Sequence, residues 1–167
     1  MTESGAWLRR GGHGHQADGS LVVWSVAEGR HGRRWREAVV DGDTIRSSLL
    51  LELAPDGRFS HLELTTAAGL LTLHPEADGT LHGNAVTAGG IRHVAGLEWD
   101  RDGAIWLSGS SICLAAGRRP DGSRATTWLD VGLDLALRTR AVRPDWNLVD
   151  PDGVPVLENG ATWPLEE

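Results

Sequence analysis

The chain has 167 residues, a formal net charge of −7 and 40% hydrophobic residues, so its composition fits one globular domain and neither a disordered chain nor a membrane protein. All 16 basic residues are arginine and tyrosine is absent, which excludes chemistry that needs a P-loop lysine, a Schiff-base lysine or a tyrosine acid. The acidic balance argues against a nucleic-acid partner, and no stretch approaches the about 18 apolar residues of a membrane span. We therefore expect a cytoplasmic protein.

The two ends of the chain differ from its middle. Residues 1–20 are polar and rich in glycine, and we expect a flexible N-terminal segment in which His13 and His15 are loop residues. Residues 144–167 contain four prolines and six acidic residues, which predicts an irregular acidic tail that packs on the domain formed by residues 21–143. No metal site is predicted.

The dipeptide Asp-Gly is the strongest local signal. Both residues tolerate the positive φ of tight hairpin turns, so Asp-Gly between alternating apolar runs predicts antiparallel strand pairs. It occurs seven times, at residues 18–19, 41–42, 56–57, 78–79, 102–103, 121–122 and 152–153. The runs around these turns predict strands at 21–26, 36–40, 45–54, 58–66, 70–73, 80–86, 91–99, 104–115, 124–131 and 133–140.

These strands define the expected fold class. No window of helical length keeps an apolar stripe at a period of 3.6 residues. Roughly nine or ten short strands joined by hairpins predict an all-β, single-domain antiparallel β-barrel or strongly curved sheet with an enclosed apolar cavity. The run 104–115 is uncharged on both faces, so we expect something to pack outside it, either the tail or a second subunit in a homodimer.

Eight tryptophans beside one phenylalanine are the main compositional clue to a ligand. Each tryptophan taken singly fits core filling, but the set favours a pocket, because an indole offers a broad apolar face and one N–H donor. The small residues at 109–111, Ser110 among them, leave space at the centre of their predicted strand. The basic cluster around Arg36 fits either a solvated turn or a contact with an anion. The predicted ligand-binding residues are Trp24, Trp99, Trp106, Trp128, Arg36 and Ser110.

Two positions suggest acid–base chemistry. Strand alternation places His93 with Ile91, Leu97 and Trp99 on the inward face, where it is either a satisfied core histidine or a catalyst with a lowered pKa. His61 and Glu63 share one face of the run 58–66, which fits a general base or an exposed polar face. The candidate catalytic residues are therefore His93, His61 and Glu63.

Cys113 is the only cysteine and lies in an apolar run, so a buried thiol is the better interpretation than a nucleophile. The sequence contains none of the glycine-rich or nucleophile-elbow motifs that accompany common cofactors and hydrolases, and we expect no cofactor.

Four segments resemble the glycolipid-binding family of bacterial proteins: Leu21 to Glu28, Ser48 to Leu73, Gly96 to Asp100 and Thr127 to Leu135. Their order covers most of residues 21–140. The resemblance implies a long curved antiparallel sheet, similar to lipoprotein carriers, with a hydrophobic concavity for a ligand.

Two functions follow as hypotheses. The first is binding of a hydrophobic or amphipathic small molecule, such as a lipid, glycolipid or polyketide-like compound, in a tryptophan-lined cavity. The alternative is a cofactor-independent cyclase or isomerase of specialised metabolism that uses the same cavity, because catalysis by orientation leaves almost no motif in a sequence.

Overall fold

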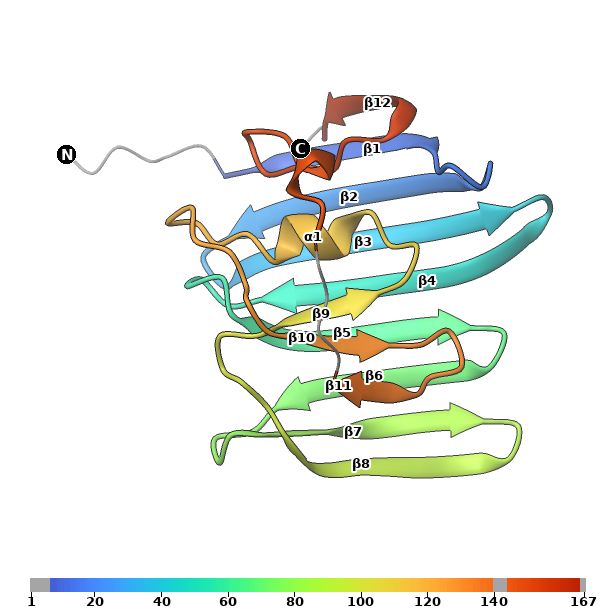
Figure 1. Cartoon of the computed structure of the whole chain (residues 1–167), viewed down its shortest axis with the longest axis vertical. Helices are drawn as coiled ribbons and strands as arrows, with labels where there is room; N and C mark the ends of the chain where they lie inside the picture. Colours follow the sequence, from blue (N-terminus) through green and yellow to red (C-terminus); the bar gives the residue numbers. More distant parts are fainter. Residues whose placement is uncertain (1–6, 140–143, 166–167) are drawn as a thin grey trace.

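The structure, a computed structural model, describes residues 7–139 and 144–165 (Figure 1). Within these residues, nine strands form one antiparallel sheet in the order β12-β1-β2-β3-β4-β5-β6-β7-β8. Their bounds are β1 Arg9–His15, β2 Leu21–Gly29, β3 Gly32–Asp41, β4 Thr44–Leu53, β5 Phe59–Thr66, β6 Gly69–Pro75, β7 Thr80–Thr87, β8 Gly90–Glu98 and β12 Glu158–Pro164.

A second, smaller layer lies in front of this sheet in Figure 1. Strand β9 (Ala104–Leu107) pairs in parallel with β10 (Trp128–Val131), and β11 (Leu137–Thr139) pairs antiparallel with β10. Helix α1 (Ile112–Ala116) follows β9 and contacts β3, and all five of its residues are buried. A short 3-10 helix, η1 (Trp146–Leu148), lies before β12 in the chain.

The Asp-Gly turns behave as predicted in the large sheet. The turns at 18–19, 41–42, 56–57 and 78–79 each join consecutive antiparallel strands, and the glycine of each has a positive φ. The turn at 102–103 is different, because it leads from β8 in the large sheet to β9 in the small one. The predicted antiparallel sheet of hairpins is confirmed for β2 to β8.

The face of the large sheet that meets the small layer forms the core. Side chains alternate between this inner face and an open outer face, as the two-residue period of a strand requires. In β2, for example, Val22, Trp24 and Val26 are buried, whereas Val23 is exposed. One continuous apolar cluster runs from β2 to β8 and includes residues of β9, α1 and β10.

The sheet is not closed into a barrel. Its edges are β12 and β8, which do not pair with each other. Closure is not needed to bury the inner face, because β9, α1 and β10 cover it. The fold is therefore an open antiparallel sheet with a second layer.

Both chain ends contribute strands where the sequence predicted a flexible segment and an irregular tail. Residues 9–15 form β1 and residues 158–164 form β12, paired with each other. The glycines of β1 explain its place in the sheet, since they leave room for large neighbouring side chains to lie across it. Residues 1–6, 140–143 and 166–167 lie outside the described part of the chain.

The predicted strand 104–115 is wrong beyond Leu107. A turn at Gly109, with φ +81°, ends the extended segment, and residues 112–116 form α1. A short run that is apolar on every side fits a buried helix as well as a buried strand, so its period does not decide between them. The predicted strand 133–140 is likewise interrupted by a turn at 132–135, and only Leu137–Thr139 pair as β11.

Candidate functional site

A cavity of about 510 Å³ lies between the β1–β2 turn, the end of β9 with α1, and the segment that leads into β12. Its volume falls within the range of about 300–1,000 Å³ typical of small-molecule sites. It is lined by His15, Gln16, Ala17, Asp18, Trp106, Gly109, Ser110, Ser111, Leu114, Leu148, Val156, Leu157 and Glu158. We call it the inner cavity.

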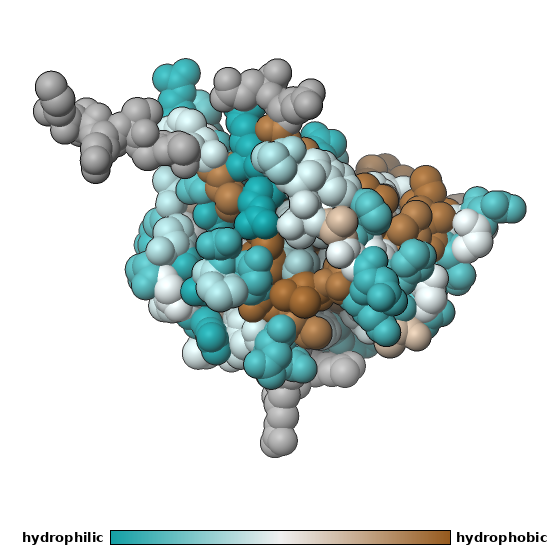
Figure 2. Space-filling view, turned by 90° about the horizontal axis from the view of Figure 1, so that it is seen from above, coloured by the Kyte–Doolittle hydropathy of each residue, from teal (hydrophilic) through white to brown (hydrophobic). Residues whose placement is uncertain are grey.

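The apolar wall of the inner cavity is formed by side chains from three parts of the fold. Trp106 comes from β9 and Leu114 from α1, while Leu148 and Val156 stand at the rim and are about half exposed, at 50% and 48%. At the β12 end of the molecule, hydrophobic residues are visible among hydrophilic ones on the surface (Figure 2). An apolar body bound here would contact carbon on several sides.

Behind Trp106 lies a cluster of aromatic rings. The rings of Trp106 and Trp128 meet edge to face with centroids 5.8 Å apart, and Trp128 lies 6.1 Å from Trp146. The guanidinium of Arg124 sits 4.8 Å from the ring centre of Trp146. Edge-to-face pairs and a cation above an indole are favourable geometries. They hold Trp106 in place at the cavity wall.

The polar end of the inner cavity is anchored by a buried carboxylate. Oε2 of Glu37, on the inner face of β3, accepts hydrogen bonds from the Ser111 amide at 2.7 Å, the Ser111 hydroxyl at 2.5 Å and the Ile112 amide at 3.2 Å. Glu37 is 97% buried, and its Oε1 lacks a hydrogen-bond partner in the described part of the chain, as does the buried hydroxyl of Ser110. Glu37 thus fixes the 109–112 turn from behind.

Burial raises the pKa of Glu37, because the low-dielectric core disfavours its charged form, and the hydrogen bonds from Ser111 oppose this effect. The carboxyl is therefore biased toward holding a proton at a higher pH than an exposed glutamate. Ser111 lines the cavity, and its hydroxyl is in direct contact with this carboxyl group.

The opposite rim carries a polar network on the β1–β2 turn. Ser20 donates to Gln16 at 3.0 Å and to Asp18 at 2.6 Å, and Arg46 of β4 forms an ion pair with Asp18 at 2.8 Å. The side chain of Gln16 also donates to the carbonyl of Gly109. This bond ties the two sides of the inner cavity together.

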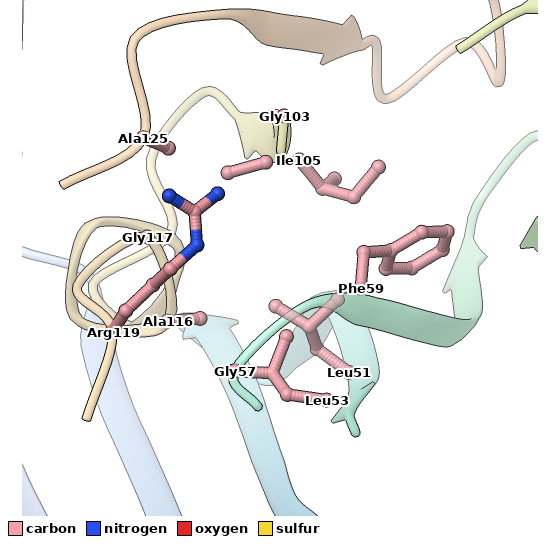
Figure 3. A pocket seen from close by; sticks show the side chains of 11 residues that line it. Leu51, Leu53, Gly57, Phe59, Gly103, Ile105, Ala116, Gly117, Arg119 and Ala125 are labelled. Atoms are coloured by element: carbon pink, nitrogen blue, oxygen red, sulfur yellow. The ribbon is translucent and has the colours of Figure 1, made fainter. Parts of the chain in front are cut away.

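A second, much smaller space lies between β4, β9 and the segment after α1 (Figure 3). It has a volume of about 10 Å³, which fits a single water molecule and no ligand. Arg119 extends into it, and its buried Nε lacks a partner among the described residues.

The predicted ligand-binding tryptophans are not gathered around one cavity. Trp106 lines the inner cavity together with the predicted Ser110, and Trp128 packs behind Trp106. Trp24 is buried against Trp35 in the core, with ring centroids 6.0 Å apart. Trp99 packs edge to face on Phe59 at 5.5 Å.

The candidate catalytic residues lie on the other side of the sheet. His61 and Glu63 share the outer face of β5, where His61 Nε2 lies 3.1 Å from Glu63 Oε1. The predicted Arg36 is also on this face, exposed on β3.

The predicted inward orientation of His93 is wrong. His93 is exposed and lies 2.6 Å from Asn84 through its Nδ1, while the next residue, Val94, is the buried one. The physical reason is a register shift against β7 between Leu81 and Gly83, which reverses the alternation of β8 between Leu97 and Val94.

Sequence reasoning missed Glu37 and Ser111. The signal for Glu37 was the alternation of Trp35, Glu37 and Val39, which puts a carboxylate between two large apolar residues on one face of a strand. A charge in such a position is buried, and it needs partners from elsewhere in the fold. Ser111 supplies them only because the chain turns into α1.

Within residues 7–139 and 144–165, no group of three or more histidine, cysteine, aspartate or glutamate side chains is arranged to hold a metal ion. In the same residues, no helix has the length and apolar character to cross a membrane. Comparison with known proteins gives no match to a family model, a curated protein or a solved structure.

Proposed function

We propose that the chain binds a hydrophobic or amphipathic small molecule, such as a lipid, in the inner cavity. The observation that carries the proposal is a cavity of about 510 Å³ with Trp106, Leu114 and Leu157 in its wall and the polar residues Ser110 and Ser111 at one end. A mainly apolar lining with few polar groups suits a ligand with an apolar body and a polar head. The resemblance to glycolipid-binding proteins points in the same direction.

The proposed orientation places the ligand's polar head at the 109–111 turn. Ser110 and Ser111 lie there, and Glu37 holds the turn in place by accepting two hydrogen bonds from Ser111 and one from the Ile112 amide. The apolar body then extends past Trp106 toward Leu148 and Val156, whose half-exposed side chains mark the entrance.

Tryptophan quenching by a nitroxide-labelled stearate tests the proposal. We expect saturable quenching in the parent protein and a much weaker response in Trp106→Ala, with Trp7→Ala as the control because Trp7 is 54% exposed and away from this cavity. Val156→Arg is a second variant that places a charge at the entrance without disturbing the core. Equal responses of all three variants would refute a ligand site in the inner cavity.

The second candidate function, a cofactor-independent isomerase or cyclase, is favoured by one observation. Ser111 lines the cavity and its hydroxyl donates to a carboxylate whose pKa burial raises, so a proton has a short path between this residue and Glu37. In this function Ser111 is the residue that touches the substrate, and Glu37 is a positioning residue that also stores the proton.

The variant Ser111→Ala distinguishes binding from catalysis. It removes the hydroxyl but keeps the backbone amide that donates a hydrogen bond to Glu37. Ligand extracted from the parent and the variant is compared by chromatography and mass spectrometry. Isomeric species of one mass that differ between the two proteins favour catalysis. The same single species from both favours a carrier.

A further inference from the structure

The outer face of the large sheet carries a hollow of its own, on the opposite side from the inner cavity. Its volume is about 460 Å³, and it is lined by residues of β2 to β5 and of β12. Its lining combines the indole of Trp163, the apolar side chains of Val23 and Leu50, the guanidinium of Arg36 and the carboxylate of Glu63. We call it the outer hollow.

The strand register sets these side chains in one row across the sheet. Trp163 pairs with Gly11, which pairs with Ser25, and Ser25 pairs with Arg36. The row continues through Leu50 to Glu63 on β5. Because neighbouring strands are about 4.8 Å apart, the row places an aromatic ring, a cation and an anion at fixed intervals along one line.

Glycine at position 11 lets the indole of Trp163 extend across β1 into the hollow. A Cβ at Gly11 would stand 3.1 Å from Nε1 of Trp163, so the ring lies directly over this glycine. His13 also contacts the indole, with ring centroids 5.3 Å apart. The indole is therefore fixed at the wall of the hollow, yet it remains 36% exposed.

Arg36 stands out among the arginines of β3. Arg33 forms an ion pair with Glu28 at 2.9 Å, and Arg34 forms one with Glu52 at 2.6 Å. Among the described residues, the side chain of Arg36 has neither a hydrogen bond nor an ion pair, and Arg36 is exposed at the floor of the hollow. Glu63 forms no ion pair with Arg36, since Leu50 on β4 separates the two and Oε1 of Glu63 contacts His61 instead.

We propose that the outer hollow is a second binding site, one for a small aromatic carboxylate. The ring of the ligand lies against Trp163 and over Ser25, whose small side chain leaves room for it. Its carboxylate meets the guanidinium of Arg36, whose planar fork matches a carboxylate in two parallel hydrogen bonds. The small floor and the unpaired cation define this ligand class, and neither feature belongs to the inner cavity.

The experiment is titration calorimetry with naphthoate and, as its uncharged counterpart, naphthamide. We expect naphthoate to bind the parent protein more tightly than naphthamide, and Arg36→Gln to weaken naphthoate about tenfold while leaving naphthamide unchanged. Arg34→Gln is the matched control, because Arg34 lies on the same face of the same strand but is already paired with Glu52. It should leave the affinity for naphthoate within about twofold.

Two further variants locate the bound naphthoate. Trp163→Ala should weaken both compounds, whereas Val156→Arg, at the entrance of the inner cavity, should affect neither. The proposal is overturned if naphthoate fails to bind at millimolar concentration, if the two arginine variants weaken it equally, or if Val156→Arg abolishes binding. The last result assigns naphthoate to the inner cavity.

Discussion

The indole of Trp24 lies across Gly12 of the neighbouring strand on the inner face of the sheet. A Cβ at Gly12 would stand only 2.6 Å from Cε2 and Nε1 of Trp24. Trp24 is 98% buried, and its ring packs against Trp35. Because Gly12 has no side chain, β1 can pack directly against the indole of Trp24 in the core.

Gly12→Ala tests this contact. The added methyl group must displace a buried indole, and overpacking of this kind typically costs about 1–3 kcal/mol of unfolding free energy. The measurement is chemical denaturation followed by tryptophan fluorescence. Gly29→Ala is the control, because a Cβ there meets nothing within 4 Å. Equal stability of the two variants would contradict the placement of β1 against Trp24.

Glu37 makes the stability of the fold depend on pH. Its pKa in the folded protein is raised by burial above the ordinary value of 4.5. The stability that comes from its protonated form is present below pH 4.5 and is lost as the pH rises through the folded-state pKa. Relative to the parent, Glu37→Gln should therefore gain stability as the pH rises across this window, because glutamine keeps an acceptor for Ser111 and does not ionise.

Denaturation of parent and variant at a series of pH values measures this difference. Glu52→Gln is the control, since Glu52 pairs with Arg34 on the outer face. If the difference in unfolding free energy between the parent and Glu37→Gln stays constant from pH 4 upward, burial does not shift the pKa of the Glu37 carboxyl group. At pH 4, Glu37→Ala should lose about 1–3 kcal/mol relative to the parent, because the amides of Ser111 and Ile112 then lack their acceptor, and this loss should become smaller as the pH rises.

The thiol of Cys113 should be inert in the folded protein. It is fully buried in α1, and burial raises its pKa to about 12, so almost no thiolate is present near neutral pH. Since the thiolate is the nucleophile, we expect alkylation by iodoacetamide to be at least about a hundredfold slower in buffer than in denaturant. Mass spectrometry of timed samples measures both rates. Rapid alkylation of the native protein would mean that α1 opens readily.

The sheet was predictable from sequence because its signals are local. Asp-Gly pairs specify positive φ at fixed places, and the alternation of Leu49, Leu51 and Leu53 requires no knowledge of other segments. The small layer was not predictable in the same way. Whether the run that contains Ile112 becomes strand or helix depends on a turn at Gly109 and on an acceptor, Glu37, 75 residues away in the chain from Ile112.

The candidate site was predicted only in part for a related reason. Trp106 and Ser110 do line the inner cavity, but Arg36 and Glu63 belong to the outer face. Assigning a residue to a face needs the phase of the alternation, and one irregularity in a strand reverses that phase for every residue beyond it. The glycines of β1 form no apolar pattern, so the sequence did not predict a strand there. Only the structure shows that they make room for the tryptophan rings that lie over them.

Strand β8 gives a direct test of this phase. With the register shift in place, His93 points outward beside Asn84 and Val94 points into the core. His93→Gln should therefore change the unfolding free energy by no more than about 0.5 kcal/mol, as expected for an exposed position. Val94→Asn buries an unsatisfied amide and should cost about 1–3 kcal/mol or more.

The same pair of variants also decides whether His93 acts in the inner cavity. An exposed histidine on the outer face cannot reach a ligand beside Trp106. Nitroxide-labelled stearate should therefore quench the tryptophan fluorescence of His93→Gln as strongly as that of the parent protein. If instead His93→Gln is destabilised and Val94→Asn is not, the alternation of β8 is uninterrupted and His93 lies on the inner face. Both variants sit on one strand at neighbouring positions, so the comparison isolates the direction in which each side chain points.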